Sequence, residues 1–423
     1  MRFILTSFVF LCSFFIFSQD FSERKISRIL NEIKALNKAH VAISVVSLNA
    51  SKSIVSYQAD HYMTPASNIK LLTFLAAIEN FDSLPSLYYR EQDSITHFKS
   101  TGYPLLLHPF YPDQELSSFL KQKQSLVYHR SKSKIKSQGP GWAWDDYSYY
   151  HAAESSPFPI YGNVIQGFGE PFAPKFIPSI FETRSNFDTL ANILNRERIK
   201  NSFYYNSKKW NALDTLYRPF ITSDDVFVGL LKDHLNRPIN LLNESKKIPW
   251  ELLYTHQETM LYKALLQDSD NGVAEALLAM ISQKRFDEMN IERTIDTLKL
   301  QWRDWLPDPV EWVDGSGVSR YNMVTPRTLI AVLKKIYNKA GLQTIKNYFP
   351  QSGLTGTLKK YNLKNVYAKT GTLRHNHNLS GYWISPKGNV YAFSIMANHF
   401  TASINEVRDA IGQLLNNFQK KLK

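Results

Sequence analysis

The stretch TPASNIKLLTFLAAI, residues 64–78, places a serine and a lysine three positions apart at the start of an apolar run. Almost every residue from Ile69 to Ile78 is apolar, which predicts a helix buried on all sides. Positions i and i+3 share one face of a helix, so Ser67 and Lys70 can approach each other. A serine needs a base to become a good nucleophile, and burial lowers the pKa of a lysine amine. The stretch therefore predicts a nucleophile and its base.

The flanking segments predict an antiparallel sheet. Residues 41–48 and 53–58 are short, rich in β-branched residues and separated by a turn, which predicts a hairpin. Three more strands are predicted near the other end of the chain, at residues 366–369, 379–384 and 389–397. Strands at both ends with helices between them predict an α+β fold whose sheet combines the two ends of the chain.

Further helices are predicted where apolar residues recur every three or four positions. These segments are residues 21–36, 187–199, 250–280, 325–340 and the C-terminal segment from Ser403. Residues 187–199 are the single predicted helix in the middle of the chain, so we expect that region to be predominantly non-helical.

Residues 85–247 differ in composition from both flanking segments. They contain many aromatic residues, scattered Pro and Gly, and a basic run at 121–136. We therefore expect an inserted, mostly β domain at 85–247. Residues 19–84 and 248–423 would then form one discontinuous domain.

The amino-acid composition is typical of a globular protein and does not indicate which kind of partner it binds. The chain is 43% hydrophobic and 21% charged, as in globular proteins, and its length of 423 residues predicts two or three folding units. The formal net charge of +13 fits nucleic acid, an anionic envelope surface or a solvated basic exterior equally well.

The N-terminal residues 1–18 predict a signal peptide. Arg2 precedes an apolar run at 3–17, which is shorter than the roughly 20 residues that span a bilayer. An uncleaved anchor helix is the alternative. Cleavage would remove Cys12, the single cysteine, and this excludes a cysteine nucleophile and a zinc–cysteine site in an exported chain.

Two other short patterns accompany the serine and lysine. Ser269-Asp270-Asn271 precedes a helical segment and could alternatively be a helix cap formed by Ser269 or Asn271. Lys369-Thr370-Gly371-Thr372 ends a predicted strand and offers a cation, hydroxyls and a glycine that allows close backbone approach. A Ser-x-x-Lys pattern alone is weak, because four further copies occur in charge-rich stretches, starting at Ser22, Ser118, Ser131 and Ser133.

Together the three patterns resemble the serine penicillin-recognising enzymes. More specifically, the chain resembles class C low-molecular-mass penicillin-binding proteins, the D-alanyl-D-alanine carboxypeptidase/endopeptidase group with a large insertion between the first two motifs. The matching stretches are residues 65–73, 141–146, 269–271 with 274–275, 314–320 and 368–373. The resemblance implies a β-lactamase/transpeptidase-like antiparallel sheet flanked by helices, with residues 19–84 and 248–423 as the catalytic domain.

The resemblance also implies catalytic roles. Ser67 would be the nucleophile and Lys70 its base, while Ser269 would relay the proton to the leaving amine. Asn271 would hold a substrate amide and the Lys70 ammonium, and Lys369 would tune this network electrostatically.

Three further residues would bind substrate. Thr370 and Thr372 would take the substrate carboxylate beside Gly371, and the backbone N–H groups of Ser67 and Thr372 would form the oxyanion hole. The implied substrates are peptidoglycan stem peptides, with β-lactam antibiotics as inhibitors. We expect an exported, periplasmic enzyme without cofactor, associated at most peripherally with the membrane.

Two alternatives remain open at this point: a β-lactamase that uses the same serine, and a non-catalytic peptidoglycan-binding scaffold. Residues 374–378 are more polar than the small residues usual in this group, which affects the rim of the pocket.

The other candidate sites carry less weight. His375 and His377, and the pair Asp145-Asp146, lack the further ligands of a metal site, so we expect no metal. The basic residues at 129–136 are expected to be a solvated face and not a nucleic-acid site.

Overall fold

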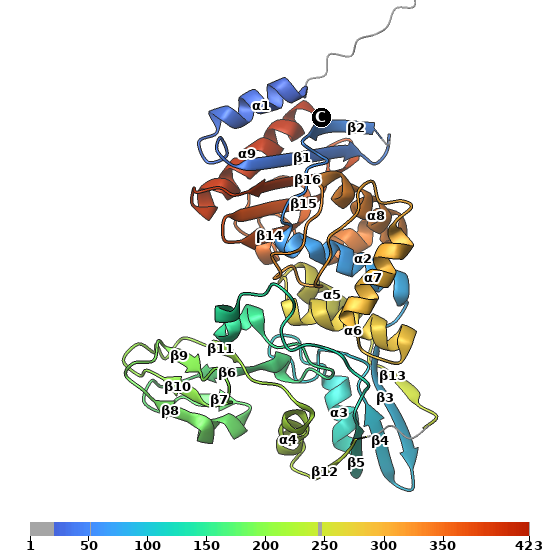
Figure 1. The fold of residues 1–423 in the computed structure, drawn as a ribbon, viewed down its shortest axis with the longest axis vertical. Helices are drawn as coiled ribbons and strands as arrows, with labels where there is room; N and C mark the ends of the chain where they lie inside the picture. The colour runs from blue at the N-terminus through green and yellow to red at the C-terminus, as the bar shows by residue number, and fades with distance from the viewer. Residues whose placement is uncertain (1–20, 51, 244–247, 423) are drawn as a thin grey trace, which may run out of the picture.

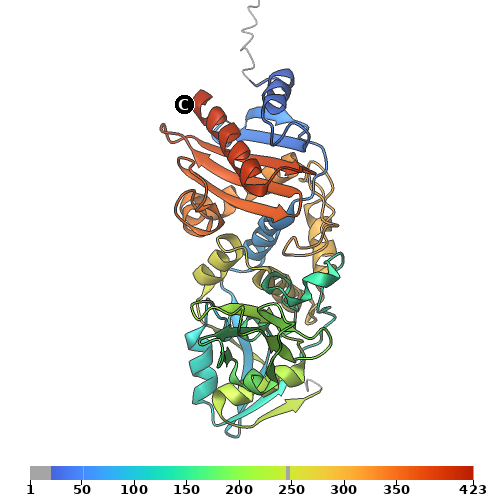
Figure 2. The same cartoon turned by 90° about the vertical axis from the view of Figure 1, so that its left-hand side faces the viewer.

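The computed structural model describes residues 21–50, 52–243 and 248–422, which form two parts along one long axis (Figures 1 and 2). One part is a five-stranded sheet with helices on both faces, and the other contains three further sheets built from the middle of the chain. This mixture of helices and antiparallel strands confirms the predicted α+β class. The predicted signal segment, residues 1–18, lies outside the described residues.

The five-stranded sheet has the order β14-β15-β16-β1-β2, and all neighbours are antiparallel. The predicted hairpin and the three predicted C-terminal strands are all present, so the two ends of the chain meet in one sheet. The pairing of Ile43 with Ile395 joins the two ends. The strands are β1 (His40–Ser47), β2 (Lys52–Tyr57), β14 (Val366–Leu373), β15 (Asn376–Ile384) and β16 (Val390–Asn398).

Helices cover both faces of this sheet and enclose two apolar cores. One face packs against α1 and the amphipathic α9, which begins with a capping box between Ser403 and Glu406. The other face packs against α2 and α8, and α2 is buried nearly all round, as its apolar sequence predicts. The helices are α1 (Glu23–Glu32), α2 (Lys70–Asn80), α5 (Glu258–Leu266), α6 (Asn271–Phe286), α7 (Ile291–Trp302), α8 (Pro326–Tyr348) and α9 (Ile404–Lys421).

The middle of the chain forms three sheets and two α-helices at the other end of the molecule (Figure 1). The largest sheet has the order β12-β5-β4-β3-β13, and the smaller ones have the orders β8-β10-β9 and β11-β6-β7. The helices are α3 (Gln114–Gln122) and α4 (Asp224–Leu235). The strands are β3 (Pro85–Gln92), β4 (Ile95–Lys99), β5 (Ser125–His129), β6 (Val164–Phe168), β7 (Lys175–Ile177), β8 (Ser185–Phe187), β9 (Leu194–Arg196), β10 (Phe203–Tyr205), β11 (Leu216–Pro219), β12 (Ile239–Leu242) and β13 (Glu251–Tyr254).

Short 3₁₀ helices connect these elements. They are η1 (Ala66–Ile69), η2 (Trp144–Ser148), η3 (Tyr150–Ala152), η4 (Tyr161–Asn163), η5 (Ser179–Arg184) and η6 (Gly356–Leu358). Ser67 was expected in the first turn of the buried helix and lies instead in η1, directly before α2.

Two helix predictions were wrong. The segment 187–199 contains β9, in which buried Leu194 and Arg196 alternate with half-buried Asn195, a period of two and not of 3.6. Residues 251–254 form β13 because their backbone pairs with β3, and helix α5 begins only at Glu258. Among the described residues, no helix is both long and apolar enough to span a membrane.

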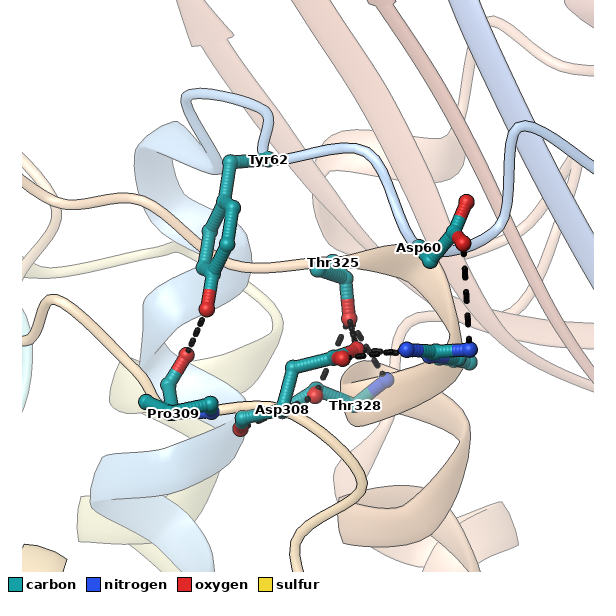
Figure 3. Close-up of polar contacts among 7 residues, drawn as sticks. Asp60, Tyr62, Asp308, Pro309, Thr325 and Thr328 are labelled. Carbon is teal, nitrogen blue, oxygen red and sulfur yellow. Dashed lines mark hydrogen bonds and ion pairs between the residues drawn. The ribbon is translucent and has the colours of Figure 1, made fainter.

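The loop that leads into η1 is tied to the segment before α8 (Figure 3). Tyr62 donates a hydrogen bond to the Pro309 carbonyl at 2.9 Å, and Thr325 donates to Asp308 at 2.6 Å. Arg327 pairs with Asp308. Tyr62 and Asp60, which lies 3.9 Å from Arg327, join the loop to this segment and fix the approach of the chain to Ser67 in η1.

Candidate active site

Lys70 lies at the centre of a hydrogen-bonded cluster around Ser67. Its Nζ is 3.0 Å from Ser67 Oγ, 2.6 Å from Asn271 Oδ1 and 2.6 Å from the Ser316 carbonyl oxygen. The turn from η1 into α2 brings Ser67 and Lys70 together, as the i, i+3 spacing predicts. The side chain of Lys70 is fully buried.

Burial sets the protonation of Lys70. Desolvation lowers the pKa of the Lys70 amine to about 8, although the carboxylates of Asp314, Asp270 and Glu275 act in the opposite direction. An amine with this pKa is partly neutral near neutral pH. It can therefore accept a proton from the neighbouring hydroxyl.

A second buried lysine holds the next hydroxyl. Lys369 Nζ, on β14, lies 2.8 Å from Ser269 Oγ and 2.9 Å from the Thr370 carbonyl oxygen. Burial and the nearby charge of Lys70 both lower the pKa of Lys369 well below its usual range. Ser67, Lys70, Ser269, Asn271 and Lys369 thus come from three separate stretches of sequence and meet in one place.

The loop before α6 is clamped through Asp270. Asp270 caps α6 by accepting from the Val273 N–H at 2.9 Å, so neither Ser269 nor Asn271 is the cap. Ser269 has a left-handed φ of 62°, a conformation that non-glycine residues rarely adopt. The Tyr150 hydroxyl donates to Asp270, and His108 Nε2 lies 3.5 Å from the same carboxylate oxygen.

The side chains of this clamp, His108 and Tyr150, come from the predicted insertion. Burial would raise the pKa of Asp270, but the contacts with His108, Tyr150 and the Val273 N–H hold it at about 2. The insertion also reaches Asn271, whose amide donates to the His151 carbonyl at 2.7 Å. Residues outside the three motifs therefore hold the Ser269–Asn271 loop in place.

The carbonyl of Ser316 belongs to a turn packed against η1. A Cβ on Gly317 would lie 2.0 Å from the Ala66 carbonyl oxygen, so only glycine fits there. The Glu275 carboxylate accepts from the Ser316 N–H at 2.8 Å, and Asp314 accepts from Trp142 Nε1 at 2.8 Å. Burial and the charge of Asp314 raise the pKa of Glu275.

Strand β14 forms the other wall of the site. Gly371 allows close approach, since a Cβ there would lie 2.3 Å from the Pro65 carbonyl oxygen. Thr370 Oγ1 contacts Thr357 Oγ1 at 2.8 Å, and Thr372 Oγ1 contacts His377 Nδ1 at 2.7 Å. The two predicted carboxylate-binding hydroxyls thus lie on one strand on either side of a glycine.

Ser67 opens into a cleft of about 840 Å³. Ser269, Asn271 and Thr372 also line it, so nucleophile and motif hydroxyls face the same space. Charged side chains surround the cleft, namely Asp145, Asp146, Arg320 and Arg374. This arrangement can accommodate a peptide with charged groups.

The remaining candidates have other environments. His375 Nδ1 lies 2.9 Å from the Phe400 carbonyl oxygen, whereas His377 is buried on β15, beside β14. No group of three or more His, Cys, Asp or Glu side chains could hold a metal ion within the part of the chain that the structure describes. Lys134 is exposed and lies 3.4 Å from Glu288.

Sequence reasoning assigned no role to several residues that complete the site. They are Tyr150, Glu275, Ser316, His108 and His377. Glu275 and Ser316 lie in stretches that resemble the penicillin-binding group, so a sequence pattern could have identified them. No sequence pattern marked His108 or Tyr150.

The fold and the buried Ser–Lys pair define a serine acyl-transfer enzyme of the penicillin-recognising class. The sequence matches the D-Ala-D-Ala carboxypeptidase 3 (S13) family over residues 22–87 and 242–418, and the chain belongs to this family. The predicted family is confirmed. The match leaves residues 88–241 outside, close to the insertion predicted at 85–247.

Individual relatives agree with this assignment. The chain is 22% identical to D-alanyl-D-alanine carboxypeptidase DacB of Haemophilus influenzae, over 86% of each chain. It is 30% identical to the D-alanyl-D-alanine carboxypeptidase of Actinomadura sp. strain R39, over 38% of this chain and 33% of that protein. The crystal structure of penicillin binding protein 4 (dacB) from Haemophilus influenzae superposes with a TM-score of 0.72 at 19% identity, covering 94% of this chain and 99% of that one.

Proposed function

We propose that the protein is an exported serine-type D-Ala-D-Ala carboxypeptidase, DD-endopeptidase or both, which acts on peptidoglycan stem peptides through an acyl-enzyme on Ser67. The single observation that carries this proposal is the contact of 3.0 Å between the fully buried Lys70 amine and Ser67 Oγ. The S13 family and the names of the relatives support the substrate class.

The hydrogen bonds of Lys70 explain how it acts as the base. In the neutral amine, two N–H bonds are directed to the Ser316 carbonyl and Asn271 Oδ1. The remaining lone pair then faces Ser67 Oγ. Lys70 accepts the Ser67 proton as Oγ attacks the substrate carbonyl carbon and its π electrons move to the oxygen.

Breakdown of the tetrahedral intermediate needs a proton on the leaving amine. Ser269, whose hydroxyl lies 2.8 Å from Lys369 Nζ, would relay that proton from Lys70 as the C–N bond breaks. The backbone N–H groups of Ser67 and Thr372 would stabilise the oxyanion. Water then attacks the Ser67 ester, releases the shortened peptide and regenerates the serine.

The substrate carboxylate would bind Thr370 and Thr372 on β14, beside Gly371. A β-lactam presents a strained amide and a carboxylate with similar spacing, so β-lactam antibiotics would acylate the same serine. The related Haemophilus influenzae protein has been crystallised with a β-lactam. Export follows from the predicted signal peptide, and we place the enzyme in the periplasm, at most peripherally associated with the membrane.

Labelling with a fluorescent penicillin tests the proposal. We expect a stable ester on Ser67, identified by mass mapping of the labelled peptide, and its loss in Ser67→Ala. Ser118→Ala is the matched control, because Ser118 also begins a Ser-x-x-Lys pattern but is exposed on α3. Labelling at another residue would refute the assignment, and so would a folded protein that is not labelled at all. A label lost within seconds would favour the β-lactamase alternative.

A further inference from the structure

Three polar side chains, from β14, from the neighbouring β15 and from the segment after η6, are connected by hydrogen bonds. Thr372 Oγ1 is 2.7 Å from His377 Nδ1, and His377 Nε2 is 2.7 Å from the Tyr361 hydroxyl. His377 is directly opposite Thr372 in the β14–β15 pairing. His377 and Tyr361 are only 1% and 4% exposed, whereas Thr372 is exposed and lines the cleft. These hydrogen bonds therefore connect the protein interior to the cleft.

His377 is neutral in this setting. Burial, together with the charge of Arg408, lowers the pKa of His377 to about 4. The rings of His377 and Tyr361 are nearly parallel, at 12°, with their centroids 6.4 Å apart. A neutral imidazole has one N–H donor and one acceptor nitrogen, so each of its two contacts has a direction.

Only one direction satisfies all three side chains. If Nε2 carried the proton, Nδ1 would accept the Thr372 proton, and the buried Tyr361 hydroxyl proton would have no acceptor. If Nδ1 carries the proton, Tyr361 O–H donates to Nε2 and Nδ1–H donates to Thr372 Oγ1. His377 is the only side-chain hydrogen-bond partner of the Tyr361 hydroxyl among the described residues, and an unsatisfied buried donor is unfavourable. The second arrangement is therefore the stable one.

The geometry points to Tyr361 and His377 as positioning residues that make Thr372 a fixed hydrogen-bond donor towards the cleft, selecting substrates that end in a free carboxylate. With its oxygen already accepting from Nδ1–H, Thr372 directs its own proton at the ligand. Among the described residues, the side chain of the neighbouring Thr370 has one hydrogen-bond partner, the hydroxyl of Thr357, and a pair of hydroxyls can reverse direction. The inference rests on the proposed function for its ligand, the terminal carboxylate of the peptide.

The histidine tautomer can be measured without any activity. In protein labelled with ¹⁵N-histidine, we expect the ¹⁵N shifts of His377 to show protonated Nδ1 and unprotonated Nε2. The signal is assigned by its absence in His377→Asn, since the chain has 11 histidines. In Tyr361→Phe, which removes only the hydroxyl, we expect a shift towards the Nε2–H tautomer. An Nε2–H tautomer in the unmodified protein would overturn the inference.

Selectivity for the carboxylate is the second measurement. We compare acylation of Ser67 by a penicillin and by its methyl ester, which lacks the anionic oxygen. The acid-to-ester rate ratio should fall about tenfold in Tyr361→Phe, the effect of misdirecting one hydrogen bond to a charged group. His377→Asn should retain most of the ratio, because an amide N–H can replace Nδ1–H, whereas His377→Leu should lose it.

Tyr391→Phe is the matched control, because Tyr391 is a buried tyrosine in the same apolar core. Its ratio should equal that of the unmodified protein. An unchanged ratio in folded Tyr361→Phe would also overturn the inference. If the unmodified protein is not acylated at Ser67, the proposed function fails, while the tautomer measurement still decides the direction of the hydrogen bonds.

Discussion

At the residue scale, the proposed chemistry depends on the Lys70 amine, which contacts no carboxylate directly among the residues that the structure describes. Lys70 has three oxygen partners, Ser67 Oγ, Asn271 Oδ1 and the Ser316 carbonyl, and none of them carries a formal charge. A carboxylate in their place would stabilise the ammonium form and raise the pKa of Lys70. Neutral partners and burial together keep the amine available as a base.

Lys70→Arg should fold and still lose about 10²–10⁴-fold in the rate of penicillin acylation, the range of general-base catalysis. Arginine keeps the positive charge but cannot be deprotonated at working pH. The measurement is stopped-flow acylation with fluorescent penicillin, with thermal unfolding as the control for folding. Acylation within a few-fold of the unmodified protein would show that another base is used.

The pH dependence of acylation follows from the same amine. The pKa of Lys70 is lowered to about 8, so the fraction of neutral base increases as pH rises. The acylation rate should therefore rise about tenfold per pH unit below that pKa and level off above it. Single-turnover rates from about pH 6 to about pH 9 check this. A flat profile across this window would exclude a titrating Lys70.

At the scale of elements, the loop between α5 and α6 is held from two sides. Lys369 on β14 contacts Ser269, and the insertion contacts Asp270 and Asn271 through Tyr150 and His151. Helix α6 begins directly after this loop, with Asp270 as its cap. Residues of the predicted insertion are therefore part of the support of the site.

Tyr150→Phe should lower acylation about tenfold, because it removes a hydrogen bond to the buried Asp270 carboxylate. The neighbouring Tyr149 stacks on His151 and is half exposed, so Tyr149→Phe is the matched control and should change little. The measurement is the acylation rate, with unfolding temperature as the second readout. Equal rates for the two variants would mean that the Tyr150 hydroxyl does not support the loop.

At the scale of the whole molecule, the sheet with its covering helices and the insertion lie at opposite ends of an elongated shape (Figure 2). The basic segment after β5 returns to the catalytic part, where Ser133 forms a β-bridge with Met289. Lys132, Lys134 and Lys136 are exposed along this segment. They lie outside the residues that line the cleft at Ser67.

Removing the charges of Lys132, Lys134 and Lys136 should leave penicillin acylation nearly unchanged, because the small ligand does not reach them. Binding to intact sacculi should weaken, and the difference should shrink at high salt, which screens exposed charges beyond about 10 Å at 0.1 M. Pull-down of both proteins across a salt series is the measurement.

The matched control removes three exposed lysines of α8, Lys335, Lys339 and Lys346. If sacculus binding is the same for the unmodified protein and both variants at every salt concentration, the basic segment is only a solvated face.

The sequence by itself determined the α+β class, the hairpin, the buried helix and the order of the three motifs. These features depend on residue type and on periodicity within a dozen neighbouring positions, which a local reading can detect. The Ser-x-x-Lys spacing together with the apolar helix that follows it therefore indicates Ser67 with Lys70, and residue type indicates the strand that carries Lys369.

Only the tertiary structure decided what surrounds those residues. Tyr150 reaches Asp270 across 120 positions, and the Ser316 carbonyl reaches Lys70 across 246. Such contacts depend on the path of the whole chain. His377 shows the same limit, because its polarity was visible in the sequence, whereas its place between Thr372 and Tyr361 follows from strand pairing and burial. A hydrogen bond between distant positions requires a specific distance and direction, and local periodicity specifies neither.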